Sequence, residues 1–184
     1  MEEISDSEER LESYDVVASL WRVPWKHNYN DNHVHSLYLD HLVKTMTPWY
    51  LCNRPPGAAG AMIISEGYII YGNVGPADGA PSCKMLGCEI VDGHCVRTIR
   101  AEQRVIIHAA KLGAKTINTD MYTILKPCYE CTKHIVTAGI RRIFYAGIAY
   151  DEDRTNELLR SSNTQCLYID VGLKYAQEFV VKEK

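Results

Sequence analysis

The order of apolar patterns after residue 60 restricts this chain to one fold class. Two short β-rich runs, 61–65 and 68–71, flank Glu66-Gly67 and predict a hairpin. Helical and strand-like patterns then alternate along the rest of the chain. The predicted helices are 101–112, 128–138, 154–161 and 173–180, and the predicted strands are 116–125, 142–145 and 165–171. A hairpin followed by strand–helix–strand units predicts an α/β domain with a mixed sheet and helices on both faces.

The first 50 residues carry helical patterns of their own. Apolar residues recur at helical spacing over 11–21 and again over 37–46. We therefore predict an N-terminal helical extension over 1–50 that packs on a single body formed by 51–184. Residues 72–93 are rich in glycine and predict a long irregular loop, a kind of segment that is usually functional in a compact domain.

Charge and hydropathy exclude several classes of protein. The chain has 184 residues and a formal net charge of −3, so it lacks the excess of Lys and Arg with which proteins bind polymeric nucleic acid. No apolar run reaches the roughly 18 residues that a membrane span needs. The acidic start, Met1 to Asp6, does not have the pattern of a secretory signal. We expect a cytoplasmic protein that binds neither a membrane nor a nucleic-acid polymer.

Two of the seven cysteines stand at the predicted start of a helix. Cys128 and Cys131 follow Pro127, and residues three apart share one face of a helix. The positive end of the helix dipole favours the thiolate, which is the form that binds a metal, so both sulfurs can reach one Zn²⁺. The same spacing is typical of redox pairs, and that alternative stays open here.

A second segment, Arg100-Ala101-Glu102, opens the predicted helix upstream. Zinc deaminases combine His-x-Glu with Pro-Cys-x-x-Cys; the His and the two Cys bind Zn²⁺, and the Glu transfers protons without binding the metal. Glu102, Cys128 and Cys131 fit this signature, whereas Arg100 stands at the histidine position. The alternative role for Glu102 is that of a first-turn carboxylate stabilised by the helix dipole.

These motifs belong to a wider resemblance over about half of the chain. Residues 52–145 resemble the deoxycytidylate (dCMP) deaminases of the cytidine deaminase superfamily. The matching segments are Gly60-Ala61-Met62-Ile63 after Cys52, Cys83 with Cys88, Cys95-Val96-Arg97-Thr98 before Ala101-Glu102-Gln103, and Pro127 to Lys133. The resemblance implies a three-layer α/β/α cytidine-deaminase-like fold with a five-stranded mixed sheet. It also implies Zn²⁺, hydrolysis of the 4-amino group of a cytosine nucleotide (dCMP to dUMP) with Glu102 carrying the protons, and a homo-oligomer.

Arg100 departs from the family pattern at a metal ligand. An arginine offers only hydrogen-bond donors, so it cannot ligate a cation. We therefore expect a catalytic zinc that is weakened or absent. His94 and Cys95 are the better candidates for a replacement ligand. His108 is too far along its helix, and His134 would point back to the sulfurs only if its helix began early.

Three further positions concern the nucleotide. This chain has Arg104 where the family usually has Asn, and it has Val74 where the family has an Asn that is expected to contact the nucleotide. Arg54, beside the insertion 55–57, is a candidate phosphate contact. We expect Arg54, Val74 and Arg104 to belong to a substrate site whose recognition is altered or lost.

A second, closed structural zinc site is possible, since tetrahedral Cys/His sets form such sites and some members of the family carry one. Its candidate ligands are Cys52, Cys83, Cys88, His94 and Cys95. We expect Cys52, Cys83 and His94 to be the main members. The alternative is a mixture of buried cysteines and a surface histidine.

Three functions follow from these residues. The first is a zinc-dependent hydrolytic deaminase of a cytosine nucleotide, of the dCMP to dUMP type. The second is a catalytically silent protein of the same fold that binds a nucleotide or a partner subunit, because Arg100 replaces the zinc ligand. The third is a variant with a changed metal or substrate, in which Arg100 binds an anionic group. In each case we expect a small-molecule nucleotide or a further copy of the chain as the partner.

Overall fold

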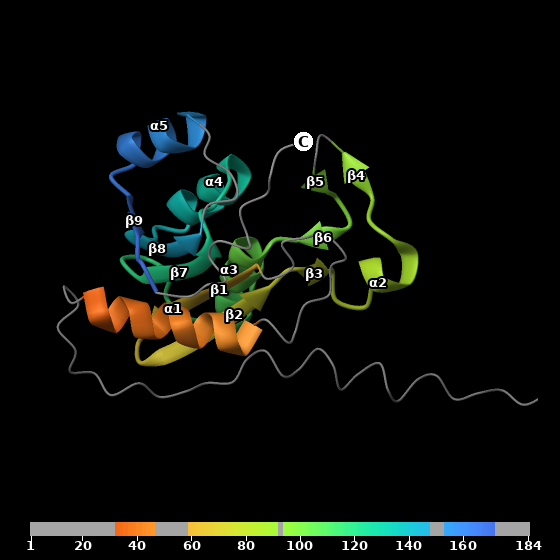
Figure 1. Ribbon diagram of the computed structural model, residues 1–184, viewed down its shortest axis with the longest axis horizontal. Coiled ribbons are helices and arrows are strands. Elements are labelled where there is room, and N and C mark those ends of the chain that lie inside the picture. The colour runs from red at the N-terminus through yellow and green to blue at the C-terminus, as the bar shows by residue number, and fades with distance from the viewer. Residues whose placement is uncertain (1–31, 47–58, 92–93, 148–152, 172–184) are drawn as a thin grey trace, which may run out of the picture.

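The computed structural model describes residues 32–46, 59–91, 94–147 and 153–171 (Figure 1). Its helices are α1 (Asn32–Met46), α2 (Cys83–Leu86), α3 (Ala101–Leu112), α4 (Tyr129–Thr137) and α5 (Asp153–Ser161). Its strands are β1 (Gly60–Ser65), β2 (Tyr68–Asn73), β3 (Gly75–Pro76), β4 (Ile90–Val91), β5 (His94–Cys95), β6 (Thr98–Ile99), β7 (Asp120–Leu125), β8 (Arg142–Gly147) and β9 (Gln165–Tyr168). The helices predicted over 11–21 and 173–180 lie outside the described residues.

Five of these strands form one mixed sheet in the order β2-β1-β7-β8-β9. Strand β1 pairs antiparallel with β2 and with β7, whereas β8 is parallel to both β7 and β9. The two turn residues of the β1–β2 hairpin, Glu66 and Gly67, have φ angles of 48° and 85°, as tight two-residue hairpin turns require. The sheet confirms the prediction of an α/β fold with five mixed strands.

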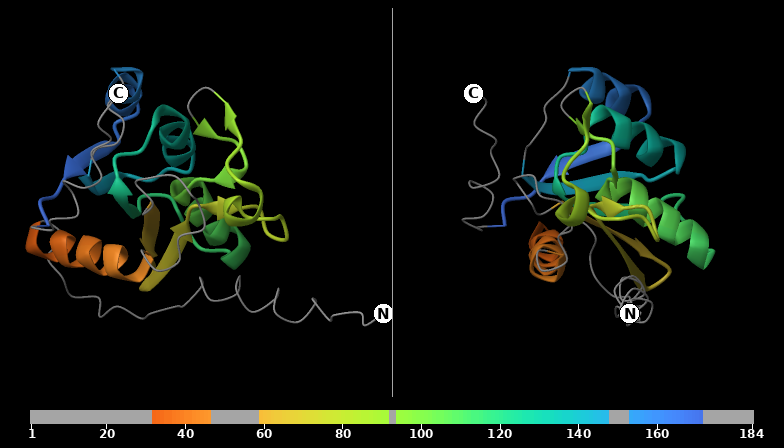
Figure 2. Two further views of the ribbon diagram at one scale, coloured as in Figure 1. Left: turned by 45° about the vertical axis from the view of Figure 1, so that its right-hand side comes forward. Right: turned by 90° about the vertical axis from the view of Figure 1, so that its right-hand side faces the viewer.

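Helices cover both faces of this sheet, because successive side chains of a strand point to opposite faces. Met62 and Tyr122 belong to a buried cluster that includes the apolar residues of α1. Their neighbours in sequence, Ile63 and Met121, belong to a second buried cluster that includes residues of α3, α4 and α5. Figure 2 shows α1 on the opposite side of the sheet from α4 and α5. The result is the predicted three-layer arrangement.

Helix α1 is the described part of the predicted extension over 1–50, and it packs closely on the sheet. The His35 ring lies parallel to the Phe144 ring with 3.8 Å between centroids, and its Nδ1 is 2.9 Å from the Tyr122 hydroxyl. A domain boundary at 50–51 stays a prediction. None of the helices in the described ranges is long and apolar enough to cross a membrane.

Strand β7 begins at Asp120 rather than at residue 116, where the apolar pattern placed it. The residues between form a turn, because the Thr119 backbone N–H donates to the Thr116 carbonyl at 3.2 Å and Asn118 has a φ of 60°. Such a left-handed residue cannot continue a strand, and Asn tolerates it better than most residues do.

The segment between β2 and α3 differs more from its prediction. Residues 75–99, here called the cysteine-bearing segment, contain two small ladders, β3 with β6 and β4 with β5, and the single turn of α2. Figure 1 shows α2, β4 and β5 to one side of the five-stranded sheet. The predicted irregular loop is therefore partly regular, but its elements are only two to four residues long, which is too short for a periodic pattern to show.

Candidate active site and cysteine cluster

The N-termini of α3 and α4 bring two predicted site residues into contact. Glu102 lies in the first turn of α3, and Cys131 lies in the first turn of α4. The Cys131 Sγ donates to Glu102 Oε2 at 3.4 Å, and both side chains are buried. The carboxylate of the predicted proton carrier and one thiol of the predicted metal pair are therefore neighbours, although 29 positions separate them.

Burial and hydrogen bonding give the three groups of this site different proton affinities. Burial raises the pKa of Glu102. A hydrogen bond from the Cys131 thiol, helped by the Cys131 backbone N–H and the charge of Arg100, lowers the pKa of Cys128 to about 6. The same hydrogen bond and burial raise the pKa of Cys131 well above its usual range. The Cys131 thiol has one proton, so it serves either the Cys128 thiolate or the Glu102 carboxylate at any moment.

Arg100 is the N-cap residue of α3, at the start of this site. Its backbone N–H donates to Gln103 Oε1 at 3.3 Å. Its positive charge opposes the rise in the pKa of Glu102 and of Cys131 and contributes to the lowered pKa of Cys128. A positively charged side chain therefore already interacts with the two thiols that would bind a metal.

The residues described here do not make up the three-ligand site of a catalytic zinc. Cys128 and Cys131 supply two donors, and Arg100, which the sequence pattern predicts at the third position, supplies none. Two histidines weighed as replacements are engaged elsewhere: His108 Nδ1 donates to the Tyr71 carbonyl at 2.8 Å, and His134 is exposed, with Nδ1 at 2.7 Å from the Glu130 carbonyl oxygen. Neither His108 nor His134 therefore serves as a third ligand in the described structure. The side chain of His94, a better candidate by sequence, lies outside the described residues.

A second group of thiols lies in the cysteine-bearing segment. The sulfurs of Cys83, Cys88 and Cys95 all lie within 4.8 Å of one another, and those of Cys83 and Cys95 are 3.7 Å apart. Cys83 opens α2 and is buried, whereas the other two are partly exposed. Burial opposes ionisation of Cys95, but the backbone groups of Glu89 and Arg97 outweigh it and lower its pKa.

This group differs from the expected one in two respects. Cys95, considered as a replacement ligand for the first site, lies with Cys83 instead. Cys88 belongs to the group, although we expected Cys52, Cys83 and His94 to be its main members. Cys52 and the side chain of His94 lie outside the described residues, so their part in the site stays a prediction.

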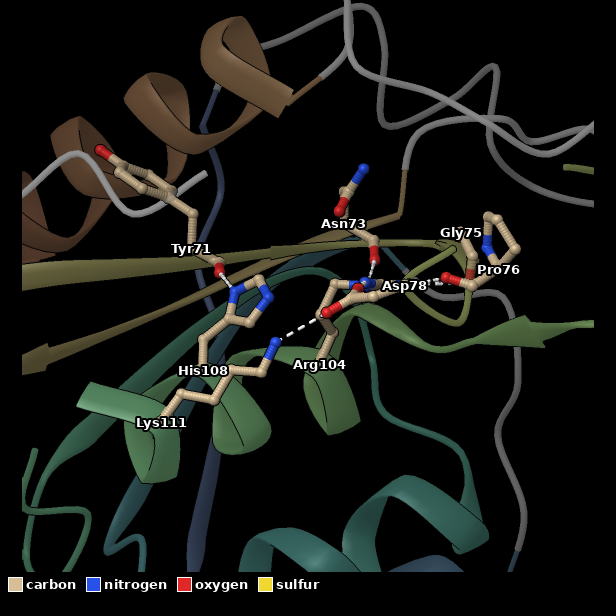
Figure 3. A network of polar contacts seen from close by, with 8 residues as sticks. All are labelled: Tyr71, Asn73, Gly75, Pro76, Asp78, Arg104, His108 and Lys111. Carbon is tan, nitrogen blue, oxygen red and sulfur yellow. Dashed lines mark hydrogen bonds and ion pairs between the residues drawn. The ribbon is translucent and has the colours of Figure 1, made fainter. Parts of the chain in front are cut away.

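The three predicted substrate residues have separate outcomes. Arg54 lies outside the described residues. Val74 is partly buried and packs against the cluster that joins α3 to the sheet. Arg104 is buried, and its guanidinium donates to four acceptors in residues 73–78, so the contacts found are with the protein itself (Figure 3). A direct contact of Arg104 with substrate stays a prediction.

Two residues of that network were missed in the sequence. Asp78 accepts hydrogen bonds from Arg104 and from Lys111, at 3.2 Å and 2.6 Å. The available signal was the spacing of Arg104, His108 and Lys111, which places three basic side chains on one face of a helix. A lone Asp in a glycine-rich loop carries no such signal.

Comparison with known proteins identifies the family of this chain. The sequence profile of the cytidine and deoxycytidylate deaminase zinc-binding region matches residues 33–147. ComE operon protein 2 of Bacillus subtilis (strain 168) is 37% identical over 93 residues, which cover 50% of this chain and 49% of the relative. Deoxycytidylate deaminase of Enterobacteria phage T4 is 32% identical over 69 residues, which cover 36% of this chain and 35% of that protein. The chain thus spans half or less of the length of these relatives.

Solved structures show the same fold. The dCMP deaminase of cyanophage S-TIM5 in complex with dCMP and dUMP has a TM-score of 0.59 at 20% identity, covering 78% of this chain and 99% of that one. A diaminohydroxyphosphoribosylaminopyrimidine deaminase/reductase of Thermotoga maritima has a TM-score of 0.58 at 17% identity, covering 80% of this chain and 40% of that one. Because the family profile also matches more than half of its residues, this chain belongs to the cytidine and deoxycytidylate deaminase family.

Proposed function

We propose that this chain binds a pyrimidine nucleotide at the N-termini of α3 and α4, in a deaminase-type site whose zinc-dependent hydrolysis is weakened or lost. The observation that carries the proposal is Arg100 at the N-cap of α3, where its charge acts on Glu102 and Cys128. A divalent ion bound by Cys128 and Cys131 would be repelled by the positive charge of Arg100 and would gain no third ligand from it. Nucleotide binding is supported by the family and by the fold shared with a dCMP-bound deaminase.

A hydrolytic deaminase that converts dCMP to dUMP is the second candidate. The contact of Cys131 with Glu102 favours this candidate, because it brings the predicted proton carrier next to a thiol of the family signature. The low pKa of Cys128 favours it too, because a metal binds the thiolate. In that case Cys128 and Cys131 would hold the metal, and zinc would supply an activated water. Glu102, whose pKa is raised by burial, would carry protons.

Metal content and turnover distinguish the two candidates. Zinc is measured by elemental analysis, dCMP binding by calorimetry and dCMP hydrolysis by ammonia release, in the natural chain and in Arg100→His, Arg100→Gln and Cys131→Ser. We expect the natural chain to bind dCMP without releasing ammonia, and Cys131→Ser to leave its zinc content unchanged. Arg100→His should gain about one zinc per chain, whereas Arg100→Gln, which removes the charge but adds no ligand, should not.

Two results would overturn the proposal. Turnover of dCMP by the natural chain that disappears in Cys131→Ser would establish the second candidate. Failure of dCMP, dUMP and the corresponding nucleosides to bind the natural chain would remove the nucleotide from the proposal and leave a deaminase fold that serves another partner.

The thiols of Cys83, Cys88 and Cys95 belong to a separate part of the proposal. Their mutual distances suit three ligands of a structural zinc, which would need one more donor to complete a tetrahedron. Such a metal would fix the cysteine-bearing segment and take no part in chemistry. The expected cytoplasmic location and homo-oligomeric state are also proposals, and light scattering of the purified protein tests the second.

A further inference from the structure

Three basic side chains on one face of α3 contact the end of β2 and the residues that follow it. Arg104, His108 and Lys111 are spaced so that their side chains leave the helix on the same side. His108 Nδ1 donates to the Tyr71 carbonyl at 2.8 Å, and Lys111 Nζ donates to Asp78 Oδ2 at 2.6 Å. Arg104 donates to acceptors in residues 73–78, which follow Tyr71 and include Asp78 (Figure 3). The three residues therefore hold both ends and the middle of one segment.

Arg104 makes most of the contacts in this network. Its Nε donates to the Asn73 carbonyl at 3.0 Å, and its Nη2 donates to the carbonyls of Gly75, at 2.9 Å, and Pro76. Its Nη1 donates to Asp78 Oδ1 at 3.2 Å. Four of the five N–H groups of a guanidinium are thus engaged with residues 73–78.

Burial separates Arg104 from the other two basic residues. Only 6% of its side chain is exposed, against 60% for Lys111, although both pair with Asp78. An exposed ion pair contributes little to stability, whereas loss of a buried charged donor removes a hydrogen bond from each of its carbonyl partners. Among the three basic residues, Arg104 therefore contributes most to the position of residues 73–78.

The same segment is joined to the candidate site at two other points. Gly75 pairs with Ile99, the residue immediately before Arg100. Gly72 packs so closely on the first turn of α3 that a Cβ built on it would lie 2.4 Å from the Ala101 carbonyl oxygen. Residues 72–78 and the start of α3, including Glu102, thus form one packed unit.

We propose that Arg104 is a positioning residue, which fixes residues 73–78 against the start of α3 and so sets the geometry of the site around Glu102. Its effect on nucleotide affinity rests on the proposed function above, whereas its effect on the segment does not. A lysine cannot replace it, because one ammonium lacks the planar fork that reaches several acceptors at once. An asparagine is too short to span them.

Hydrogen exchange tests the positioning without any ligand. Exchange is measured in peptides that cover 73–82 and 98–104, in the natural chain and in Arg104→Asn, Arg104→Lys and the control Lys111→Met. We expect at least about tenfold faster exchange in both peptides of the Arg104 variants, which corresponds to about 1.4 kcal/mol of lost local stability. Lys111→Met removes the exposed partner of Asp78 and should change exchange less than about threefold.

Calorimetry with dCMP gives the second measurement. We expect affinity to fall at least about tenfold in Arg104→Asn and Arg104→Lys, and to be nearly unchanged in Lys111→Met. If Arg104→Asn does not fold, Arg104→Lys, which keeps the charge, provides the result. Unchanged exchange in a folded Arg104 variant would overturn the inference. Faster exchange in 73–82 but not in 98–104 would overturn it as well. Faster exchange in both peptides with unchanged dCMP affinity would also overturn it. A natural chain that binds no nucleotide contradicts the proposed function, and in that case exchange in 98–104 alone decides whether Arg104 positions the site.

Discussion

The five-stranded sheet and the cysteine-bearing segment are stabilised by different kinds of contact. The sheet buries apolar side chains on both faces, against α1 on one and against α3, α4 and α5 on the other. The segment leaves its large apolar side chains exposed, namely Met85, Leu86, Ile90, Val91 and Val96. It is joined instead by three thiols and by the guanidinium of Arg104. Burial of many apolar groups spreads stability over many residues, whereas the segment depends on a few chemically specific ones.

The largest effect should come from the apolar core. Phe144 is 1% exposed and lies against His35 and Tyr122, so Phe144→Ala should lower the free energy of unfolding by about 3–5 kcal/mol. Urea denaturation followed by circular dichroism measures it. Leu167→Ala on β9, where the side chain is 41% exposed, is the control and should cost less than about 1 kcal/mol. Equal losses in the two variants would contradict the view that burial of apolar side chains stabilises the sheet.

The next largest loss of stability should come from the contact between the end of β2 and the first turn of α3, just before the cysteine-bearing segment. Gly72→Ala places a Cβ 2.4 Å from a backbone oxygen that cannot move alone, so we expect a loss of about 1–3 kcal/mol in the free energy of unfolding. Gly147→Ala is the matched control, because its nearest neighbour is the flexible end of Leu125 at 3.1 Å. A smaller loss in Gly72→Ala than in Gly147→Ala would show that the end of β2 is not packed on α3 in this way.

The thiols should affect the segment more than the whole fold. We expect Cys95→Ser to remove about one zinc per chain and to speed hydrogen exchange in residues 83–99, while the free energy of unfolding falls by less than about 1 kcal/mol. Cys166→Ser on β9 changes a cysteine outside the cluster and should leave the zinc content unchanged. A natural chain without zinc would contradict the structural metal, and a large global loss would contradict the independence of the two regions.

The smallest effect should be the contribution of His108 to the pH dependence of the free energy of unfolding. Burial lowers the pKa of His108, and the charges of Arg104 and Lys111 lower it further, against the opposing charge of Asp78. The unfolded chain then binds a proton more readily than the folded one, so this contribution is present above a pH of about 6.5 and is lost as the pH falls below it. Denaturation at pH 7 and pH 5 measures it. His108→Gln, which keeps a donor but does not titrate, should reduce the difference between the two.

Most of the described fold could be predicted because local sequence patterns indicate where its longer helices and strands lie. The helix predicted over 101–112 is α3 without change, and Gly113, with a φ of 66°, ends it as its position suggested. The start of β7 was wrong because Thr116 and Ile117 have the apolar and branched side chains of a strand, whereas the left-handed Asn118 turns the chain. Short elements such as α2 were missed because a single turn contains too few residues for a period to appear.

The candidate site divides in the same way. Spacing along the chain was enough to place Cys128 and Cys131 on one turn of a helix and Glu102 at the start of another, and residue chemistry was enough to mark Arg100 as unable to bind a metal. Only the tertiary structure showed which residues meet across the chain. These contacts are between Cys131 and Glu102, between Cys83 and Cys95, and between Arg104 and residues 73–78. The reason is physical: helix and strand periods fix the direction of side chains within one element, but the packing of elements against one another decides which side chains meet across the chain.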